Sequence, residues 1–156
     1  MLFRSARFDS AGKFQSVITF DAATVTGDSS PGSSNVSALA ISSGGRLAVA
    51  GDFTGTVDFD PTAGKREASG FGGFAVVLGA DWSWQNSLVT FNDVGGDPAE
   101  INVASAAFAD ASNLYLVGGT YVYSGDAPPT ADAFVLKTKF AAGDGVDWVQ
   151  PLGGTD

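Results

Sequence analysis

The sequence predicts an all-β protein made of repeated antiparallel units, and two observations carry this prediction. First, residues 35–51 return as residues 102–118, and the two segments align without a gap. Second, the apolar runs are short and are separated by Gly, Asp, Asn, Ser or Pro, which is typical of strands and not of helices. A long fixed period indicates a repeat architecture, in which each unit buries its apolar face by stacking on its copies.

The first two strands of each unit are expected to be the innermost ones. Residues 36–42 and 46–52 are apolar at consecutive positions, so neither segment alternates polar with apolar side chains. Strands of this kind are buried on both faces. The connection between them, residues 43–45, contains Ser and Gly, which favours a tight hairpin turn.

A third strand is expected at residues 74–78, and it recurs at 134–138. The fourth is expected at 84–91, with copies at 14–20 and 148–152, and its mixed polarity suits an outer strand. This alignment gives one repeat position to three large apolar residues: Phe14, Trp84 and Trp148. A large apolar residue that recurs in this way indicates packing between units.

Four antiparallel strands in a unit of about 60–70 residues correspond to one blade of a β-propeller. The sequence would then hold the end of a preceding blade at residues 1–20, a complete blade at 36–91 and a second blade at 102–154. Propellers close with about four to eight blades, so about two and a half blades indicate a fragment of a larger propeller. Long connections at 54–69 and 121–132 are where a binding site is expected.

The glycine, aromatic and aspartate positions resemble those of a known bacterial repeat. Residues 51–61 (GDFTGTVDFDP) and 72–78 (GGFAVVL), followed by Trp84, are similar to the SBBP-type β-propeller repeat. Residues 132–137 (DAFVLK), followed by Trp148, resemble its second half, although this copy lacks the Asp-Phe-Asp-Pro element. The resemblance implies a secreted or surface-attached bacterial protein and no particular catalytic residue.

The composition argues against several functions. The chain has neither Cys nor His, so it can form no disulfide, no Cys/His zinc site and no Ser-His-Asp triad. Eight basic residues against 17 acidic ones give a net charge of −9, which opposes binding to nucleic acid. No apolar run approaches the roughly 20 residues that cross a membrane as a helix. We therefore expect no enzymatic activity, no nucleic-acid partner and no membrane span.

Three aromatic residues outside the repeat register are candidate ligand-binding residues: Trp82, Tyr121 and Tyr123. An exposed Trp or Tyr on a loop can stack on the ring of a sugar, and repeated units would present such rings in series. Ordinary packing against neighbouring apolar side chains is the alternative for each of them.

Two acidic clusters are candidate calcium sites, because carboxylates on a turn suit a hard cation. The first consists of Asp58 and Asp60, and the second of Asp93, Asp97 and Glu100. Neither cluster has the ordered D-x-D-x-D-G spacing of a calcium loop. Solvated turns that protect strand edges are the alternative, and no other cofactor is expected.

The sequence favours a non-catalytic propeller repeat module that acts as a scaffold or binding platform for a protein or a polysaccharide. A carbohydrate-binding or carbohydrate-active propeller and a purely structural spacer are the alternatives. Glycoside hydrolysis needs only two carboxylates, but none of the 17 acids is singled out by its context. The open apolar faces of an incomplete propeller also predict that this chain self-associates.

Overall fold

The computed structural model describes residues 3–20, 33–89, 93–94, 97–122, 130–139 and 145–152. These residues form strands, turns and loops, and all strand pairs are antiparallel, which confirms the predicted all-β class. None of these residues belongs to a helix long and apolar enough to cross a membrane.

The strands form three separate units. The first is a hairpin of β1 (Phe3–Phe8) and β2 (Phe14–Phe20). The second is a sheet in chain order, with β3 (Ser33–Ile41), β4 (Leu47–Asp58), β5 (Glu67–Leu78) and β6 (Trp84–Val89). The third has the order β11-β10-β9-β8-β7, with β7 (Asp93–Val94), β8 (Asp97–Phe108), β9 (Asn113–Val122), β10 (Thr130–Lys139) and β11 (Gly145–Pro151).

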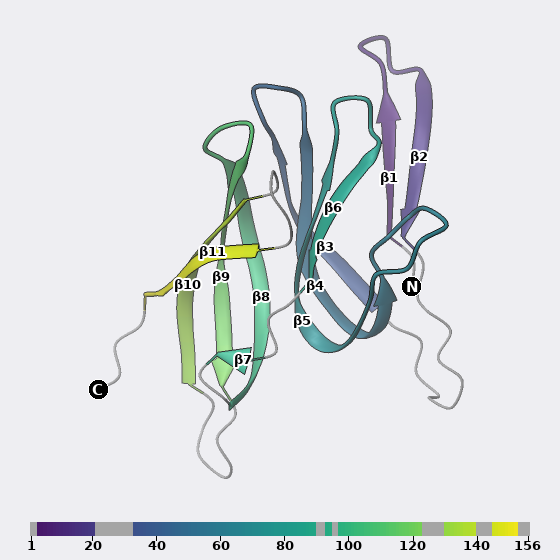
Figure 1. Ribbon diagram of the computed structural model, residues 1–156. Coiled ribbons are helices and arrows are strands. Elements are labelled where there is room, and N and C mark those ends of the chain that lie inside the picture. The colour runs from purple at the N-terminus through teal and green to yellow at the C-terminus, as the bar shows by residue number, and fades with distance from the viewer. Residues whose placement is uncertain are drawn as a thin grey trace.

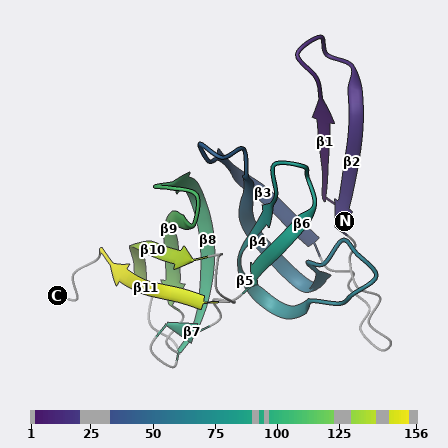
Figure 2. The same cartoon turned by 45° about the horizontal axis from the view of Figure 1, so that its top comes forward.

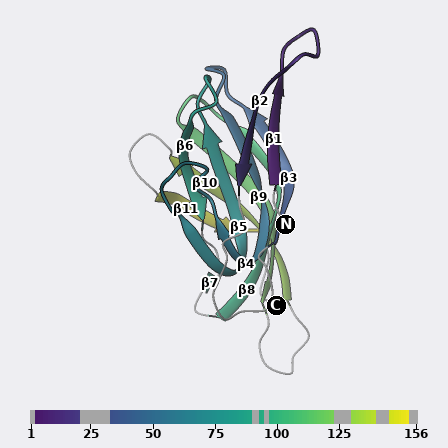
Figure 3. The ribbon, with the colours of Figure 1, turned by 90° about the vertical axis from the view of Figure 1, so that its right-hand side faces the viewer.

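The three units are stacked in chain order. Figure 1 shows the hairpin, the β3–β6 sheet and the β7–β11 sheet side by side, and the tilted view keeps this order (Figure 2). Seen from the side, the units lie one behind another (Figure 3). The strands β3 and β8, the first long strands of their sheets, are in contact, and the Ser37 hydroxyl of β3 donates a hydrogen bond to the Val103 carbonyl of β8. Within the described residues the stack does not close into a ring.

Two apolar clusters hold the stack together, one on each face of the β3–β6 sheet. We call the face of a unit that points toward the preceding unit in the chain its N-side face, and the opposite face its C-side face. The N-side cluster joins β3–β6 to the hairpin and includes Phe20, Leu47, Phe53, Val57, Phe59, Phe74, Val76 and Leu78. The C-side cluster joins Ala48, Ala50, Ala75 and Val77 to Val103, Leu114, Leu116, Phe134 and Leu136 of the next sheet.

The pairing register confirms the predicted equivalence of Phe74 and Phe134. Phe74 lies opposite Gly51 and Phe134 lies opposite Gly118, so each third strand meets its second strand in the same way. A Cβ atom at either glycine would collide with the carbonyl oxygen of an asparagine on the first strand, Asn35 in one sheet and Asn102 in the other. The repeated Asn and Gly therefore mark a close approach of two backbones that leaves no room for a side chain.

The predicted equivalence of Trp84 and Trp148 is wrong by two positions. Trp84 lies opposite Leu78, whereas Trp148 lies opposite Lys137, the equivalent of Val77. Val146 is the residue that pairs as Trp84 does. Both fourth strands have their bulge at the same point, so the shift comes from the connection, which has two more residues between Thr138 and Val146 than between Leu78 and Trp84.

The expected burial of both inner strands holds for β4 and fails for β3. Residues 47–51 are buried throughout, but Leu39 is 64% exposed and Ile41 is 74% exposed. The reason is that β3 forms the edge of its sheet, and the N-side cluster contains no described residue from this strand. The connection expected at residues 54–69 is also shorter, because β4 and β5 extend into it and leave residues 59–66 between them.

Candidate functional site

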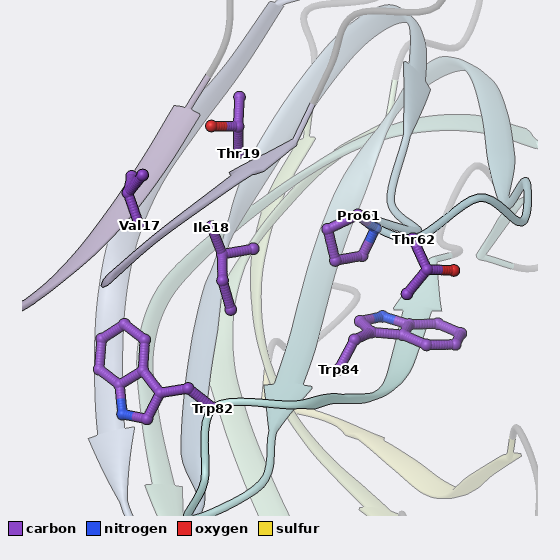
Figure 4. A pocket seen from close by; sticks show the side chains of 7 residues that line it. All are labelled: Val17, Ile18, Thr19, Pro61, Thr62, Trp82 and Trp84. Atoms are coloured by element: carbon purple, nitrogen blue, oxygen red, sulfur yellow. The ribbon is translucent and has the colours of Figure 1, made fainter. Parts of the chain in front are cut away.

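The candidate site is a pocket between the hairpin and the N-side face of the β3–β6 sheet. It has a volume of about 420 Å³ and is lined by Val17, Ile18, Thr19, Pro61, Thr62, Trp82 and Trp84. Strand β2, the β4–β5 loop and the start of β6 each contribute part of the lining, and Figure 4 shows Ile18, Pro61 and the two indole rings around it. This volume lies within the range of small-ligand sites.

Trp82 enters the pocket from the tight turn between β5 and β6. The Gly79 amide donates to the Ser83 carbonyl at 2.8 Å, and the Trp82 amide donates to the Gly79 carbonyl at 2.9 Å. The hairpins β1–β2 and β3–β4 have the same pair of hydrogen bonds, and there the corresponding residues are Gly12 and Gly45. All three residues have positive φ, +69° at Trp82 and +78° and +79° at the glycines.

A tryptophan in this conformation carries backbone strain. The left-handed region costs about 1–2 kcal/mol for a residue with a Cβ atom, and glycine avoids this cost. Strained positions are maintained where the surrounding contacts stabilise them, and they concentrate at functional sites. Among the described non-glycine residues, Trp82 alone has positive φ, which makes it the most distinctive residue of the pocket.

Two neighbours stabilise the indole of Trp82. The guanidinium carbon of Arg7 lies 5.8 Å from the centre of its ring, which is the geometry of a cation–π contact. The ring is half-buried and packs against the N-side cluster, as Trp84 does. The sequence predicted Trp82 as a ligand-binding residue and Trp84 as a packing residue, and the structure brings both into one pocket.

The Asp58 and Asp60 carboxylates bind the backbone of the β4–β5 loop. Asp58 Oδ1 accepts hydrogen bonds from the amides of Asp60 and Arg66, at 3.0 and 2.9 Å, and Asp60 Oδ1 accepts one from the Thr62 amide at 2.8 Å. These bonds hold Pro61 and Thr62 at the pocket. No group of three or more acidic side chains able to hold a metal ion occurs among the described residues.

The remaining candidates lie outside the described side chains. Tyr123 lies in a segment that the structure does not describe, and Tyr121 is described only by its backbone in β9. The same holds for Asp93 in β7 and for Asp97 and Glu100 in β8. These five residues remain candidates from the sequence.

Beside Trp82, the Asp81 carboxylate is held ionised by the turn. The hydroxyl of Ser83 donates to Asp81 Oδ1 at 2.7 Å and its amide donates at 3.0 Å, and these bonds lower the pKa of Asp81. An ionised, exposed carboxylate is a poor general acid at neutral pH. Asp81 thus closes the turn that presents the tryptophan.

The described residues that line the pocket are apolar, aromatic or hydroxyl-bearing, and none of them is titratable. They can stack on a flat ring and form a few hydrogen bonds through the two threonines. They offer no acid, base or nucleophile other than a threonine hydroxyl.

Comparison with known proteins gives no further guide to this site. No protein-family model matches the chain, and no curated protein matches it.

Proposed function

We propose that this chain is a non-catalytic β-propeller repeat module of a secreted or surface bacterial protein, and that it serves as a scaffold and binding platform. The observation that supports the proposal is the stack of units in one register. The contact between a β4 or β9 glycine and an asparagine carbonyl recurs at Gly51 and Gly118, and each of the two sheets packs its N-side face on the preceding unit. A regular stack of this kind holds its turns at fixed spacing for display.

The test is the structure of the protein encoded by the complete gene that contains this coding sequence. Further copies of the Asn-to-Gly-to-Phe register should follow one another, and electron microscopy should show four to eight sheets around an axis lined by β3 and β8. A straight stack or a gene without further copies would contradict the propeller.

The pocket favours carbohydrate as a ligand class. Trp82 carries backbone strain that glycine avoids in the two equivalent turns, and its side chain lines the same pocket as Trp84, with Ile18 between the two indole rings (Figure 4). A half-buried indole offers a flat apolar surface of the kind that packs against the C–H face of a sugar ring. The second proposal is therefore that the module binds a polysaccharide through this pocket.

Titration calorimetry with soluble oligosaccharides of β-linked glucose and N-acetylglucosamine would test the second proposal. Trp82→Gly restores the residue of the equivalent turns and removes the ring, so it should abolish binding while the fold is kept. Trp82→Phe should retain part of the affinity because it keeps an aromatic ring. Equal binding by the wild type and by Trp82→Gly would contradict a sugar site in this pocket, and absence of binding by both would favour the structural spacer.

A further inference from the structure

The C-side face of the β7–β11 sheet is partly exposed, whereas the equivalent face of the β3–β6 sheet is buried. Tyr115 and Val117 of β9 lie opposite Lys137 and Val135 of β10 on this face. Val117 is 40% exposed, and neither apolar cluster of the described residues includes a side chain from this face. In the β3–β6 sheet the equivalent residues are Ala48, Ala50, Ala75 and Val77, all of which are buried under the next sheet.

The N-side face of the hairpin is a second exposed surface. Phe8 and Phe14 lie opposite each other on this face, with ring centres 6.0 Å apart in an edge-to-face contact. They are 58% and 54% exposed. The corresponding pair in the β3–β6 sheet is Leu78 and Trp84, which belongs to the cluster covered by the hairpin.

We propose that these two surfaces bind each other between two copies of the chain, head to tail. Both contacts between units within the molecule join a C-side face to an N-side face. The exposed hairpin face is an N-side face and the exposed sheet face is a C-side face. A second copy therefore supplies the missing half of a contact that the molecule already forms twice, and such a heterologous contact propagates into rings or filaments.

The inference rests on the stacked units of the proposed function and not on ring closure or on the pocket. Loss of oligosaccharide binding in Trp82→Gly would leave it intact. Its own test is the association state of the 156-residue chain.

Sedimentation velocity on two single-face variants tests the inference. Phe8→Asp blocks the hairpin face and Val117→Arg blocks the sheet face, at two exposed positions that leave the apolar clusters unchanged. The wild type should grow in mass between about 1 and 100 µM, the range expected of a small interface. Each variant alone should stay monomeric. Their equimolar mixture should form a dimer and stop there, because each copy keeps one intact face.

Matched controls place the same charges outside the two faces. Ala11→Asp in the β1–β2 turn and Ala63→Arg in the β4–β5 loop are at exposed positions and should associate as the wild type does. Circular dichroism verifies the fold, and Phe14→Asp or Val135→Arg replaces a variant that fails to fold. The inference is overturned by a wild type that is monomeric at 100 µM, by a single variant that still dimerises, or by a mixture that remains monomeric.

Discussion

The β3–β6 and β7–β11 sheets have the same strand register but different surroundings. In both, a glycine of the second strand lies against the first strand and opposite a phenylalanine of the third, Phe74 or Phe134. The first sheet packs against other units on both faces, whereas the second packs against another unit on its N-side face alone, as far as the described residues extend. The two sheets thus show the same backbone arrangement in two different environments.

The backbone contacts are the same in the two sheets. The size of the side chains on a face differs according to whether another unit packs on that face. On the N-side faces the two sheets carry similar residues, Leu47 and Val49 in one and Leu114 and Leu116 in the other. On the C-side faces they differ, with three alanines and a valine in the first sheet against Tyr115, Val117, Val135 and Lys137 in the second. Small side chains allow the next sheet to approach closely, and larger or charged ones need a different partner.

The largest effect is expected from exchanging the residues at one equivalent C-side position, Val77 in the first sheet and Lys137 in the second. Val77→Lys places a charge under the second sheet without a partner, and we expect a loss of about 3–5 kcal/mol in the free energy of unfolding. Lys137→Val removes an ion pair with Asp147 (3.2 Å) whose side chains are both partly exposed. We expect that change to cost at most about 1 kcal/mol.

Urea unfolding followed by circular dichroism measures both variants of this exchange. Val77→Ala is the control for Val77→Lys, because it removes packing without adding a charge. Similar losses for Val77→Lys and Lys137→Val would mean that the C-side face of the second sheet is as closed as that of the first.

The glycine contact should behave alike in the two sheets. Gly51→Ala and Gly118→Ala each place a Cβ atom against a backbone carbonyl oxygen, of Asn35 or of Asn102. Because a backbone cannot move aside as a flexible side chain can, we expect each variant to lose about 1–3 kcal/mol. Differential scanning calorimetry of the two variants gives the comparison.

Gly44→Ala is the control for these glycine variants. Its nearest heavy atom would be the Ser42 hydroxyl at 3.9 Å, and the position is exposed. We expect no loss of stability there. A large difference between Gly51→Ala and Gly118→Ala would show that the two sheets do not share one register.

The sequence predicted the strands and their repeat because these depend on local patterns. The gap-free match of residues 35–51 to 102–118 identified the Asn and Gly positions that the backbone contact requires. The fourth strand was misaligned, since a connection that is two residues longer changes the register without changing the apolar pattern. The exposure of Leu39 and Ile41 could not be predicted either, because it depends on how far the neighbouring hairpin extends over β3.

The sequence singled out one of the residues that line the pocket, Trp82. Trp82 stood out because it lay outside the repeat register, and the structure adds the physical reason: it occupies a position of positive φ that holds glycine in two other turns. The contributions of Ile18 and Pro61 come from units far apart in the chain, which no local pattern connects. Their only signal was the length of the β4–β5 connection.

The smallest effect that we expect is a difference between the first hairpins of the two sheets, β3–β4 and β8–β9, in how their stability depends on pH. In β3–β4 the Ser42 hydroxyl accepts the Arg46 amide at 3.0 Å, and a hydroxyl does not titrate in this range. In β8–β9 the Asp110 carboxylate accepts the Ser112 and Asn113 amides at 2.7 and 2.9 Å, and these bonds, with one from the Asn113 side chain, lower the pKa of Asp110 below 3.8. The stabilisation by Asp110 is therefore present above pH 3.8 and is lost as the pH falls through the lower pKa of the folded protein.

Asp110→Asn keeps an acceptor oxygen in this turn but removes the charge. We expect the wild type to melt at a slightly higher temperature than the variant above pH 4, and the gap between them to close as the pH falls toward 2. Thermal melts of the two proteins at intervals of half a pH unit measure the gap, and Ser42→Ala serves as the control because its effect should not change with pH. A gap for Asp110→Asn that stays constant down to pH 2 would show that the carboxylate is not held by the turn, and that the two hairpins differ in sequence but not in their response to acid.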